Sequence, residues 1–203
     1  MTEYTGPHDY FNQDYVNEWA SIANTKRPFR LQFFASFVSE LSTLDRPKVL
    51  EIGSGPGFLA ERVLSSCDVA SYHLFDFSPH MHELSRARLT PFADKTVFHL
   101  GSFLEGGWWE SLPRPLDAVL SMQTVHEVRD IERIPKLYNE FRMLLRKDGL
   151  LLIGDQVNDD ERNEDYLVTL KEHEKLLKSS GFEKFRLVCA ASDLAMFAAM
   201  RKE

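Results

Sequence analysis

Three alternating glycines carry the clearest chemical signal in this sequence. Gly53, Gly55 and Gly57 follow an apolar run at residues 49–52, and Glu51 stands two residues before the first glycine. Glycines leave out side chains where a ligand must approach the backbone, and a turn that opens a helix presents free N–H groups that favour an anion. Because Glu51 adds the opposite charge, the segment predicts a ligand that bears both an ammonium and a carboxylate group.

A nicotinamide dinucleotide is the alternative ligand for such a turn. The dinucleotide fingerprint needs glycine at the first, third and sixth positions of the turn, and the sixth position here is Phe58. The pattern therefore favours a ligand without a pyrophosphate, and only the absorbance of a bound reduced nicotinamide would revive the dinucleotide hypothesis.

A second acid ends the next apolar run, at residues 72–75. Asp76 lies about 20 residues beyond the glycines, at the position where a carboxylate accepts hydrogen bonds from both ribose hydroxyls. Ser78 and Pro79 then supply an N-cap and a first helical residue. We therefore predict Asp76 as a ribose ligand at the carboxyl end of a strand.

Strands that alternate with helices must position these residues. The apolar patterns predict two helices before the first strand, a helix after the glycines, and helices from 78 to about 88, from 131 to a stop at Lys147-Asp148-Gly149, and from about Glu164 to Gly181. The predicted strands are 49–52, 72–75, 97–100, 116–121, 150–154, 185–189 and 195–200. Such a chain forms a mostly parallel sheet, which binds ligands beyond the carboxyl ends of its strands.

The amino-acid composition excludes several classes of protein and of partner. The 203 residues, 43% of them hydrophobic, suffice for one core, and a net charge of −7 disfavours nucleic acid and anionic membranes as partners. No apolar run is long enough to span a membrane, and the first ten residues do not resemble an export signal. Cys67 and Cys189 are isolated, which fits reduced core thiols. We therefore expect a soluble, cytoplasmic protein.

From about residue 49 to 200, the sequence resembles the class I S-adenosylmethionine-dependent methyltransferases. Their first motif reads acid, apolar, Gly-x-Gly-x-Gly, and their second strand ends in an acid that apolar-Ser-Pro often follows. Further matching segments are 116–119 with Val125-His126, 144–150 and 180–182. The resemblance implies an α/β fold: a Rossmann-like, doubly wound, seven-stranded sheet, mostly parallel with an antiparallel last strand, and helices on both faces. It also implies S-adenosylmethionine as the cofactor, a core domain at 47–203, and N-terminal helices at 1–46.

The resemblance implies which residues hold the cofactor: Glu51, Gly53, Ser54, Gly55, Gly57, Asp76, Phe77, Met81, Ser102, Phe103, Met122 and Gln123. Phe77 and Met81 fall where apolar side chains flank the adenine, although Met81 could simply fill the core. The family commonly has Gly-Asp after the third strand, and here the pair is Gly101-Ser102. A neutral serine offers the adenine about 1 kcal/mol in place of about 2 kcal/mol.

The loop after the fourth strand should face the methyl acceptor. The residues expected to bind the acceptor are Tyr10, Gln123, Thr124, His126 and Asp155. His126 lies where plant-type small-molecule O-methyltransferases place a general-base histidine, and a purely structural histidine is the alternative. Asp155-Gln156 resembles the Asp-Asn of metal-dependent catechol methyltransferases, but Met122 replaces the partner aspartate. We therefore predict no metal.

The sequence lacks the family's signatures for macromolecular acceptors. It has no Asn- or Asp-Pro-Pro-aromatic segment after the fourth strand, no nucleophilic cysteine of the kind that methylates cytosine, and no two-glutamate loop of arginine methyltransferases. We therefore predict a small-molecule acceptor under an aromatic lid formed by Tyr10, Phe11, Tyr15 and Trp19, which could also be ordinary helix packing. The rivals are an RNA or protein methyltransferase with a partner subunit, and a non-catalytic S-adenosylmethionine-binding module.

Overall fold

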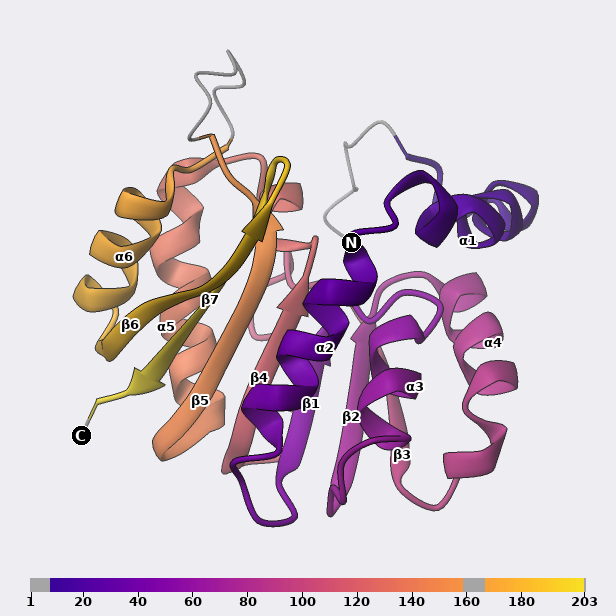
Figure 1. Cartoon of the computed structure of the whole chain (residues 1–203), viewed down its shortest axis with the longest axis horizontal. Helices are drawn as coiled ribbons and strands as arrows, with labels where there is room; N and C mark the ends of the chain where they lie inside the picture. The colour runs from indigo at the N-terminus through magenta and orange to yellow at the C-terminus, as the bar shows by residue number, and fades with distance from the viewer. Residues whose placement is uncertain (1–7, 159–166, 203) are drawn as a thin grey trace. The chain divides into compact units, whose positions relative to one another are not determined.

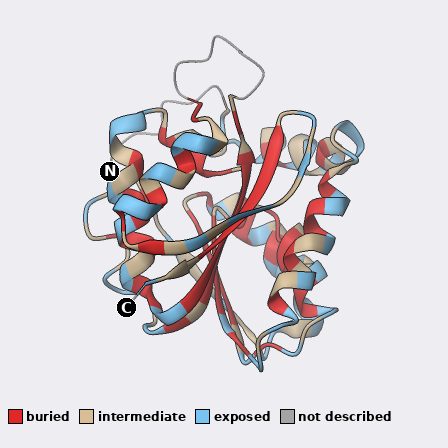
Figure 2. Cartoon of the chain, turned by 60° about the vertical axis from the view of Figure 1, so that its left-hand side comes forward, coloured by how far each residue is buried: buried red, intermediate tan, exposed pale blue. Residues whose placement is uncertain are grey.

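The computed structural model describes residues 8–158 and 167–202, which form a Rossmann-like α/β fold (Figure 1). Seven strands have the order β3-β2-β1-β4-β5-β7-β6, and helices lie on both sides of the strands (Figure 2). This confirms the predicted fold class. The chain divides into two compact units, Met1–Trp108 and Trp109–Glu203.

The first unit contains the glycine turn and the ends of two parallel strands. Its elements are α1 (Gln13–Lys26), α2 (Arg30–Leu41), β1 (Lys48–Ile52), α3 (Phe58–Leu64), β2 (Ser71–Asp76), α4 (Pro79–Arg88), a 3₁₀ turn η1 (Thr90–Phe92) and β3 (Thr96–Leu100). The register pairs Ile52 with Phe75, so the turn after β1 begins beside the end of β2. Residues 49–52 are buried without alternation, as expected for a strand covered on both faces.

The second unit contains the remaining four strands. Its elements are β4 (Leu116–Met122), the 3₁₀ turns η2 (Val125–Val128) and η3 (Ile131–Arg133), α5 (Ile134–Leu144), β5 (Leu145–Gln156), α6 (Leu170–Ser179), β6 (Phe182–Ala191) and β7 (Leu194–Arg201). β4 runs parallel to β5, with Met122 paired to Gly154. β7 is antiparallel to both β5 and β6, which confirms the antiparallel last strand.

Two predicted helix ends were wrong. The helix predicted to stop at Lys147-Asp148-Gly149 ends at Leu144, and that tripeptide lies within the span of β5. Gly149 is needed there because a Cβ atom would approach the Arg146 carbonyl oxygen to 2.8 Å.

The other predicted boundary, near Glu164, lies outside the described residues, and residues 167–169 are not helical. α6 begins only at Leu170 because Thr169 and Glu172 form a reciprocal capping box. Cys67 and Cys189 also differ from the prediction, because both are free thiols but only half-buried.

Candidate functional site

The three glycines of the turn after β1 all have positive φ values, 66°, 53° and 80° for Gly53, Gly55 and Gly57. A side chain at Gly57 would also collide with Ser85, because a Cβ atom there would lie 2.5 Å from the Ser85 Oγ atom. A Cβ atom at Gly55 would meet nothing within 4 Å. Gly57 therefore serves packing, whereas Gly55 combines a left-handed backbone with open space that a ligand can occupy.

Asp76 lies against this turn. Its Oδ2 atom accepts a hydrogen bond from the Gly55 N–H over 2.8 Å, and its Oδ1 atom accepts one from the Ser78 N–H over 2.9 Å. Burial raises the pKa of Asp76, against these backbone N–H bonds, which lower it. Ser78 caps α4 as predicted, since its Oγ atom accepts from the Met81 N–H. The structure thus brings the two sequence motifs into direct contact.

Glu51 is buried rather than solvated at the strand end, with 2% of its surface exposed. Its Oε2 atom accepts a hydrogen bond from the Tyr72 hydroxyl over 2.7 Å. The pKa of Glu51 is raised to about 8, because burial and the Asp76 carboxylate, which raise it, outweigh the Tyr72 hydroxyl and the Arg30 guanidinium, which lower it. A cationic group that arrives beside Glu51 would favour its ionised form.

Apolar side chains lie at the carboxyl ends of β2 and β3, among them the two that were predicted to flank an adenine, Phe77 and Met81. The Phe77 ring is half-buried and lies edge-on to Tyr10 and Phe11, with centroid separations of 5.8 and 5.4 Å. Met81 and Phe103 are buried. These side chains form an apolar surface beside Asp76, which fits a flat aromatic ligand.

Ser102 makes a local hydrogen bond. Its Oγ atom accepts from the Leu104 N–H over 3.2 Å. A hydroxyl oxygen has two acceptor sites, so this bond leaves one site for a ligand amino group. Ser54, another residue predicted to hold the cofactor, is buried, and its N–H donates to the Phe75 carbonyl oxygen over 3.1 Å.

The second unit contains four of the five residues predicted to meet the acceptor, at the carboxyl ends of β4 and β5, whereas the fifth, Tyr10, lies in the first unit. Gln123 follows Met122 with a φ of 55°, and its N–H donates to the Gly154 carbonyl oxygen over 2.7 Å. The Thr124 hydroxyl is buried and donates to the Met122 carbonyl oxygen over 3.2 Å. This tight turn fixes where the following residues begin.

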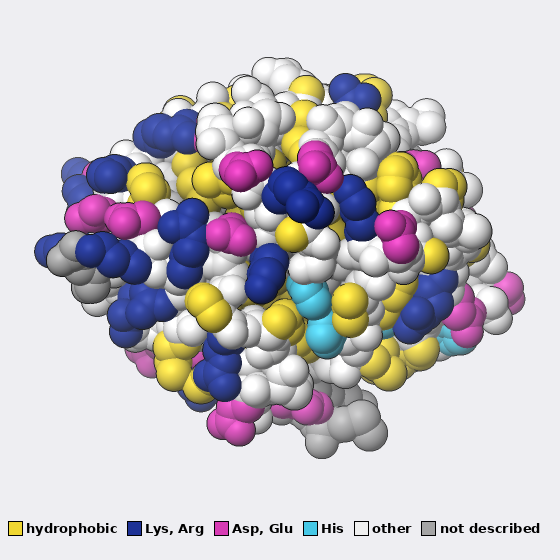
Figure 3. All heavy atoms as spheres, turned by 90° about the horizontal axis from the view of Figure 1, so that it is seen from below, with side chains coloured by type: hydrophobic (Ala, Val, Ile, Leu, Met, Phe, Trp, Pro, Cys, Tyr) yellow, Lys and Arg dark blue, Asp and Glu magenta, His cyan; other side chains and the backbone are white. Residues whose placement is uncertain are grey.

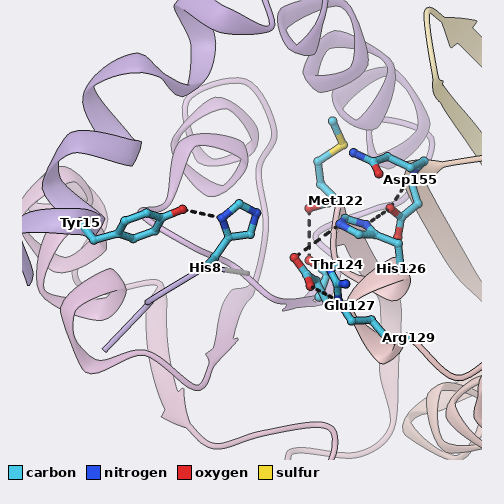
Figure 4. A network of polar contacts seen from close by, with 9 residues as sticks. His8, Tyr15, Met122, Thr124, His126, Glu127, Arg129 and Asp155 are labelled. Atoms are coloured by element: carbon cyan, nitrogen blue, oxygen red, sulfur yellow. Dashed lines mark hydrogen bonds and ion pairs between the residues drawn. The ribbon is translucent and has the colours of Figure 1, made fainter. Parts of the chain in front are cut away.

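His126 and Asp155 form a close pair in this unit (Figure 4). The His126 Nδ1 atom lies 2.5 Å from Asp155 Oδ1, and the His126 backbone N–H donates to Asp155 Oδ2 over 3.1 Å. The His126 Nε2 atom lies 3.5 Å from Glu127 Oε1, and Glu127 in turn pairs with Arg129. The ring therefore lies between two carboxylates, and Asp155, 1% exposed, orients it.

This environment keeps His126 protonated. Burial alone lowers the pKa of His126, but the carboxylates of Asp155 and Glu127 outweigh burial and raise it to about 10. Burial raises the pKa of Asp155, yet the histidine and two backbone N–H groups bring it below its ordinary value. At neutral pH the pair is an imidazolium bound to a carboxylate, and the imidazolium has no lone pair with which to accept a proton.

Sequence reasoning missed Arg30 and Tyr72, which lie near Glu51 in the first unit. Arg30 stands among the apolar residues of α2 and is itself 7% exposed. A charged residue within an apolar helix face was the available signal.

Two classes of feature are missing from the part of the chain that is described. Among these residues, no group of three His, Cys, Asp or Glu side chains could hold a metal ion. None of the described helices is long and apolar enough to cross a membrane.

A family model for a methyltransferase domain matches residues 49–149, about half of the chain. No curated protein sequence matches the chain.

Solved structures share the fold at low sequence identity. Magnesium protoporphyrin IX methyltransferase (ChlM) from Synechocystis PCC 6803, solved with bound S-adenosylmethionine, has a TM-score of 0.75 at 16% identity, over 96% of this chain and 95% of its own. N-methyltransferase NodS from Bradyrhizobium japonicum WM9, in complex with S-adenosyl-L-homocysteine, has a TM-score of 0.72 at 14% identity, over 89% and 91%. The [4+2]-cyclase SpnF has a TM-score of 0.66 at 16% identity, over 84% and 80%.

Proposed function

We propose that this chain methylates a small molecule by in-line displacement. It belongs to the class I S-adenosylmethionine-dependent methyltransferases and uses S-adenosylmethionine as its cofactor. When bound, S-adenosylmethionine supplies an electrophilic methyl group on a sulfonium. The chain's own task is then to hold both reactants in line and to exclude water. The observation that carries the proposal is the contact between Gly55 and Asp76, which joins the glycine turn to the ribose acid.

The residues of the first unit fit this cofactor. The open space at Gly55 accommodates a ligand against the backbone, and Asp76 supplies a fixed carboxylate for ribose hydroxyls. The Glu51 carboxylate suits the ammonium group of the amino-acid end. Phe77 and Met81 provide the apolar contacts for the adenine, and Ser102 accepts from its amino group.

The charge state of His126 restricts which chemical groups can serve as the methyl acceptor. An imidazolium cannot take a proton from a hydroxyl, so base catalysis by His126 requires a pH near 10, where its proton is lost. We propose instead an acceptor whose nucleophilic atom is unprotonated at neutral pH, such as a carboxylate, an aromatic amine or an acidic phenol. His126 then positions the loop after β4, and Gln123 and Thr124 help to bind the acceptor.

The N-terminal helices, within residues 1–46, are proposed as a lid. The Tyr10 carbonyl oxygen accepts a hydrogen bond from the Ser78 hydroxyl over 2.6 Å, and the Tyr10 ring lies edge-on to Phe77 and Trp19. These contacts tie the segment to the residues that follow Asp76, where closure over a ligand would exclude water. Tyr10 is the residue we expect to reach the acceptor.

The free thiols of Cys67 and Cys189 support a reducing, cytoplasmic location.

The charge distribution argues against RNA as the acceptor. The chain carries a net charge of −7, and on the face shown in Figure 3, which lies at the amino ends of the strands and away from the candidate site, the Lys and Arg side chains are interspersed with Asp and Glu. Phosphate backbones favour a continuous basic surface. Binding of a small molecule does not require a continuous basic surface.

The test measures S-adenosylhomocysteine release when the protein and S-adenosylmethionine are mixed with a panel of carboxylic acids, aromatic amines, phenols and thiols. RNA and protein fractions serve as parallel acceptors, and Asp76→Asn serves as the variant with an impaired cofactor site. We expect turnover with at least one small molecule and a marked loss in the variant. Turnover with RNA or protein alone would overturn the small-molecule proposal. Cofactor binding without turnover on any acceptor would indicate a binding module or other chemistry on this fold, as the [4+2]-cyclase illustrates.

A further inference from the structure

Two histidine side chains face each other on neighbouring strands of the first unit. The register pairs Phe75 of β2 with His99 of β3, so His73 lies diagonally across from His99 on the same face of the sheet. The His73 Nδ1 atom is 3.0 Å from the His99 Nε2 atom, and the two rings are stacked with their centroids 5.3 Å apart. Each ring therefore directs one nitrogen atom at the other. Neither histidine is among the residues predicted to hold the cofactor or the acceptor.

The face of β3 that carries His99 is open to solvent beside the pair. α4 packs on the opposite face, where the His82 ring lies edge-on to Phe98, the neighbour of His99 in the strand. The connection from β3 to β4, residues 101–115, contains no helix. Val97, on the same face as His99, is 43% exposed, and His99 itself is half-buried. A small ion can therefore reach the pair from solvent.

Both rings are neutral at neutral pH. The pKa of His73 is lowered to about 4, because burial and the neighbouring His99 and Lys48 side chains all disfavour its charged form. Burial and the neighbouring His82 lower the pKa of His99. A neutral imidazole carries a nitrogen lone pair, which the imidazolium lacks. Both nitrogen atoms can therefore bind a metal ion once the single proton between them moves to the far side of its own ring.

Ser71 provides a partner for that far side in His73. Its Oγ atom lies 3.1 Å from the His73 Nε2 atom. When Nε2 carries the proton and donates to Ser71, the lone pair of Nδ1 is directed at His99. Histidines that bind metals in proteins almost always have such a hydrogen-bond partner on the nitrogen that does not bind the ion. The local structure thus already orients His73 as a metal ligand.

The separation of the two nitrogen atoms indicates which ions fit. Metal–nitrogen bonds of about 2.0–2.1 Å place two neighbouring nitrogen ligands about 2.9 Å apart at a right angle and about 3.3 Å apart at the tetrahedral angle. The observed 3.0 Å agrees with the right angle, which is typical of Cu²⁺ and Ni²⁺. Within the described residues no third His, Cys, Asp or Glu joins the pair, so water must fill the other positions.

We propose that His73 and His99 bind one divalent transition-metal ion, Cu²⁺ or Ni²⁺, through His73 Nδ1 and His99 Nε2. The ion joins β2 to β3, which is the edge strand of the sheet and pairs with β2 alone. A ligand that binds only the folded chain stabilises the fold, so the ion should raise the melting temperature. This site is independent of the proposed methyl transfer, and the prediction of no metal beside the methyl acceptor is unaffected.

The test is a calorimetric titration of Ni²⁺ into the untagged full chain after treatment with a chelator and dialysis. We expect one saturable site per chain. His73→Gln and His99→Gln should each weaken Ni²⁺ binding by at least about tenfold, because even the hydrogen-bond partners of metal ligands contribute about that much. His80→Gln is the matched control, since His80 is a histidine of the same unit that pairs with Glu83 on α4. It should bind Ni²⁺ as the wild type does.

A second measurement protects the test against variants that fold poorly. The melting temperature of each protein is measured first without metal and then with Ni²⁺. We expect Ni²⁺ to raise it in the wild type and in His80→Gln, and to leave it unchanged in the two pair variants. His99→Gln decides the matter if His73→Gln does not fold, because His99 is only half-buried. No Ni²⁺ binding by the wild type, or wild-type affinity in His99→Gln, would overturn the proposal. An equal loss of affinity in His80→Gln would do so too, because it would show adventitious binding by surface histidines.

Discussion

The Gly55 backbone N–H donates a hydrogen bond to the Asp76 Oδ2 atom over 2.8 Å, which fixes the carboxylate against the glycine turn. The Ser78 N–H holds the other oxygen. Asp76 is 6% exposed, so few orientations are open to it. Such a carboxylate is preorganised: it loses little side-chain freedom when ribose hydroxyls donate to its remaining acceptor sites.

Asp76→Asn should weaken binding of S-adenosylhomocysteine by about 10- to 100-fold. The amide removes the charge and brings two N–H donors to a position where Gly55 and Ser78 already donate. Isothermal titration calorimetry on both proteins measures the difference. Asp68→Asn is the control, because Asp68 lies on the surface and pairs with Lys95 and Arg46. Equal affinities of the wild type and Asp76→Asn would remove Asp76 from the site.

The glycines should separate into a binding residue and a packing residue. Gly55→Ala should lower the free energy of unfolding by about 1–2 kcal/mol, which is the cost of a left-handed backbone at alanine. No steric cost is added, because a Cβ atom there meets nothing within 4 Å. In Gly57→Ala the collision with Ser85 adds to this cost, so the free energy of unfolding should fall by about 3 kcal/mol in total. Chemical unfolding and calorimetry should therefore find Gly55→Ala folded but weak in cofactor binding, and Gly57→Ala mainly unstable.

Gly106→Ala is the control for this pair, since a Cβ atom at Gly106 also meets nothing within 4 Å. We expect wild-type stability and binding from it. Full cofactor affinity in Gly55→Ala would mean that no ligand approaches the backbone at that position.

Cofactor binding should depend on pH through Glu51. Burial raises the pKa of Glu51 to about 8, so the free protein carries it largely protonated at pH 6, whereas the ligand's ammonium pairs with the ionised form. Affinity should rise between pH 6 and pH 8, by up to about tenfold for each pH unit, and binding at pH 7 should release a proton. Calorimetry in buffers of different ionisation enthalpy counts that proton, and Glu51→Gln should abolish both effects. The same slope in Glu51→Gln would assign the titration to another group.

The pair of His126 and Asp155 should stabilise the fold in a pH-dependent manner. The pKa of His126 rises from its ordinary 6.5 to about 10 in the folded protein. The stabilisation is therefore fully present below pH 6.5 and is lost as the pH rises through 10. His126→Gln should lower the free energy of unfolding by about 3 kcal/mol near pH 6 and by clearly less near pH 10.

Urea unfolding at the two pH values measures this difference. His80→Gln is the control, because His80 and Glu83 form a more exposed pair that should contribute less than about 1 kcal/mol. A cost for His126→Gln that is the same at both pH values would show that packing, and not charge, is responsible.

The sequence predicts the parts of this site that lie at strand ends. Gly55 and Asp76 could be placed together because parallel strands end at one edge of a sheet, and a single helical crossover joins the two residues, which are 21 positions apart. His126 and Asp155 were predicted singly, but their pairing across 29 residues depends on the register of Met122 with Gly154. Arg30 escaped detection because helical periodicity reports which face is buried and not what a buried charge contacts.

The predicted ends of helices were wrong where a local hydrogen bond or a close approach of the backbone decides where the helix begins or ends. α6 starts at its capping box, and such reciprocal side-chain bonds compete with an apolar periodicity that could extend further upstream. α5 ends three residues earlier than Lys147 because Leu145 already takes up extended geometry, with a ψ of 148°. Periodicity alone does not distinguish a buried helical end from the start of a buried strand.

The most direct measurement is a calorimetric titration of the purified wild-type protein with S-adenosylmethionine and S-adenosylhomocysteine. We predict saturable binding of both ligands with one site per chain, and loss of that binding in Gly55→Val, whose side chain would occupy the open space beside Asp76. Absence of binding at millimolar ligand, or unchanged binding in Gly55→Val, would contradict the assignment of this turn as the cofactor site.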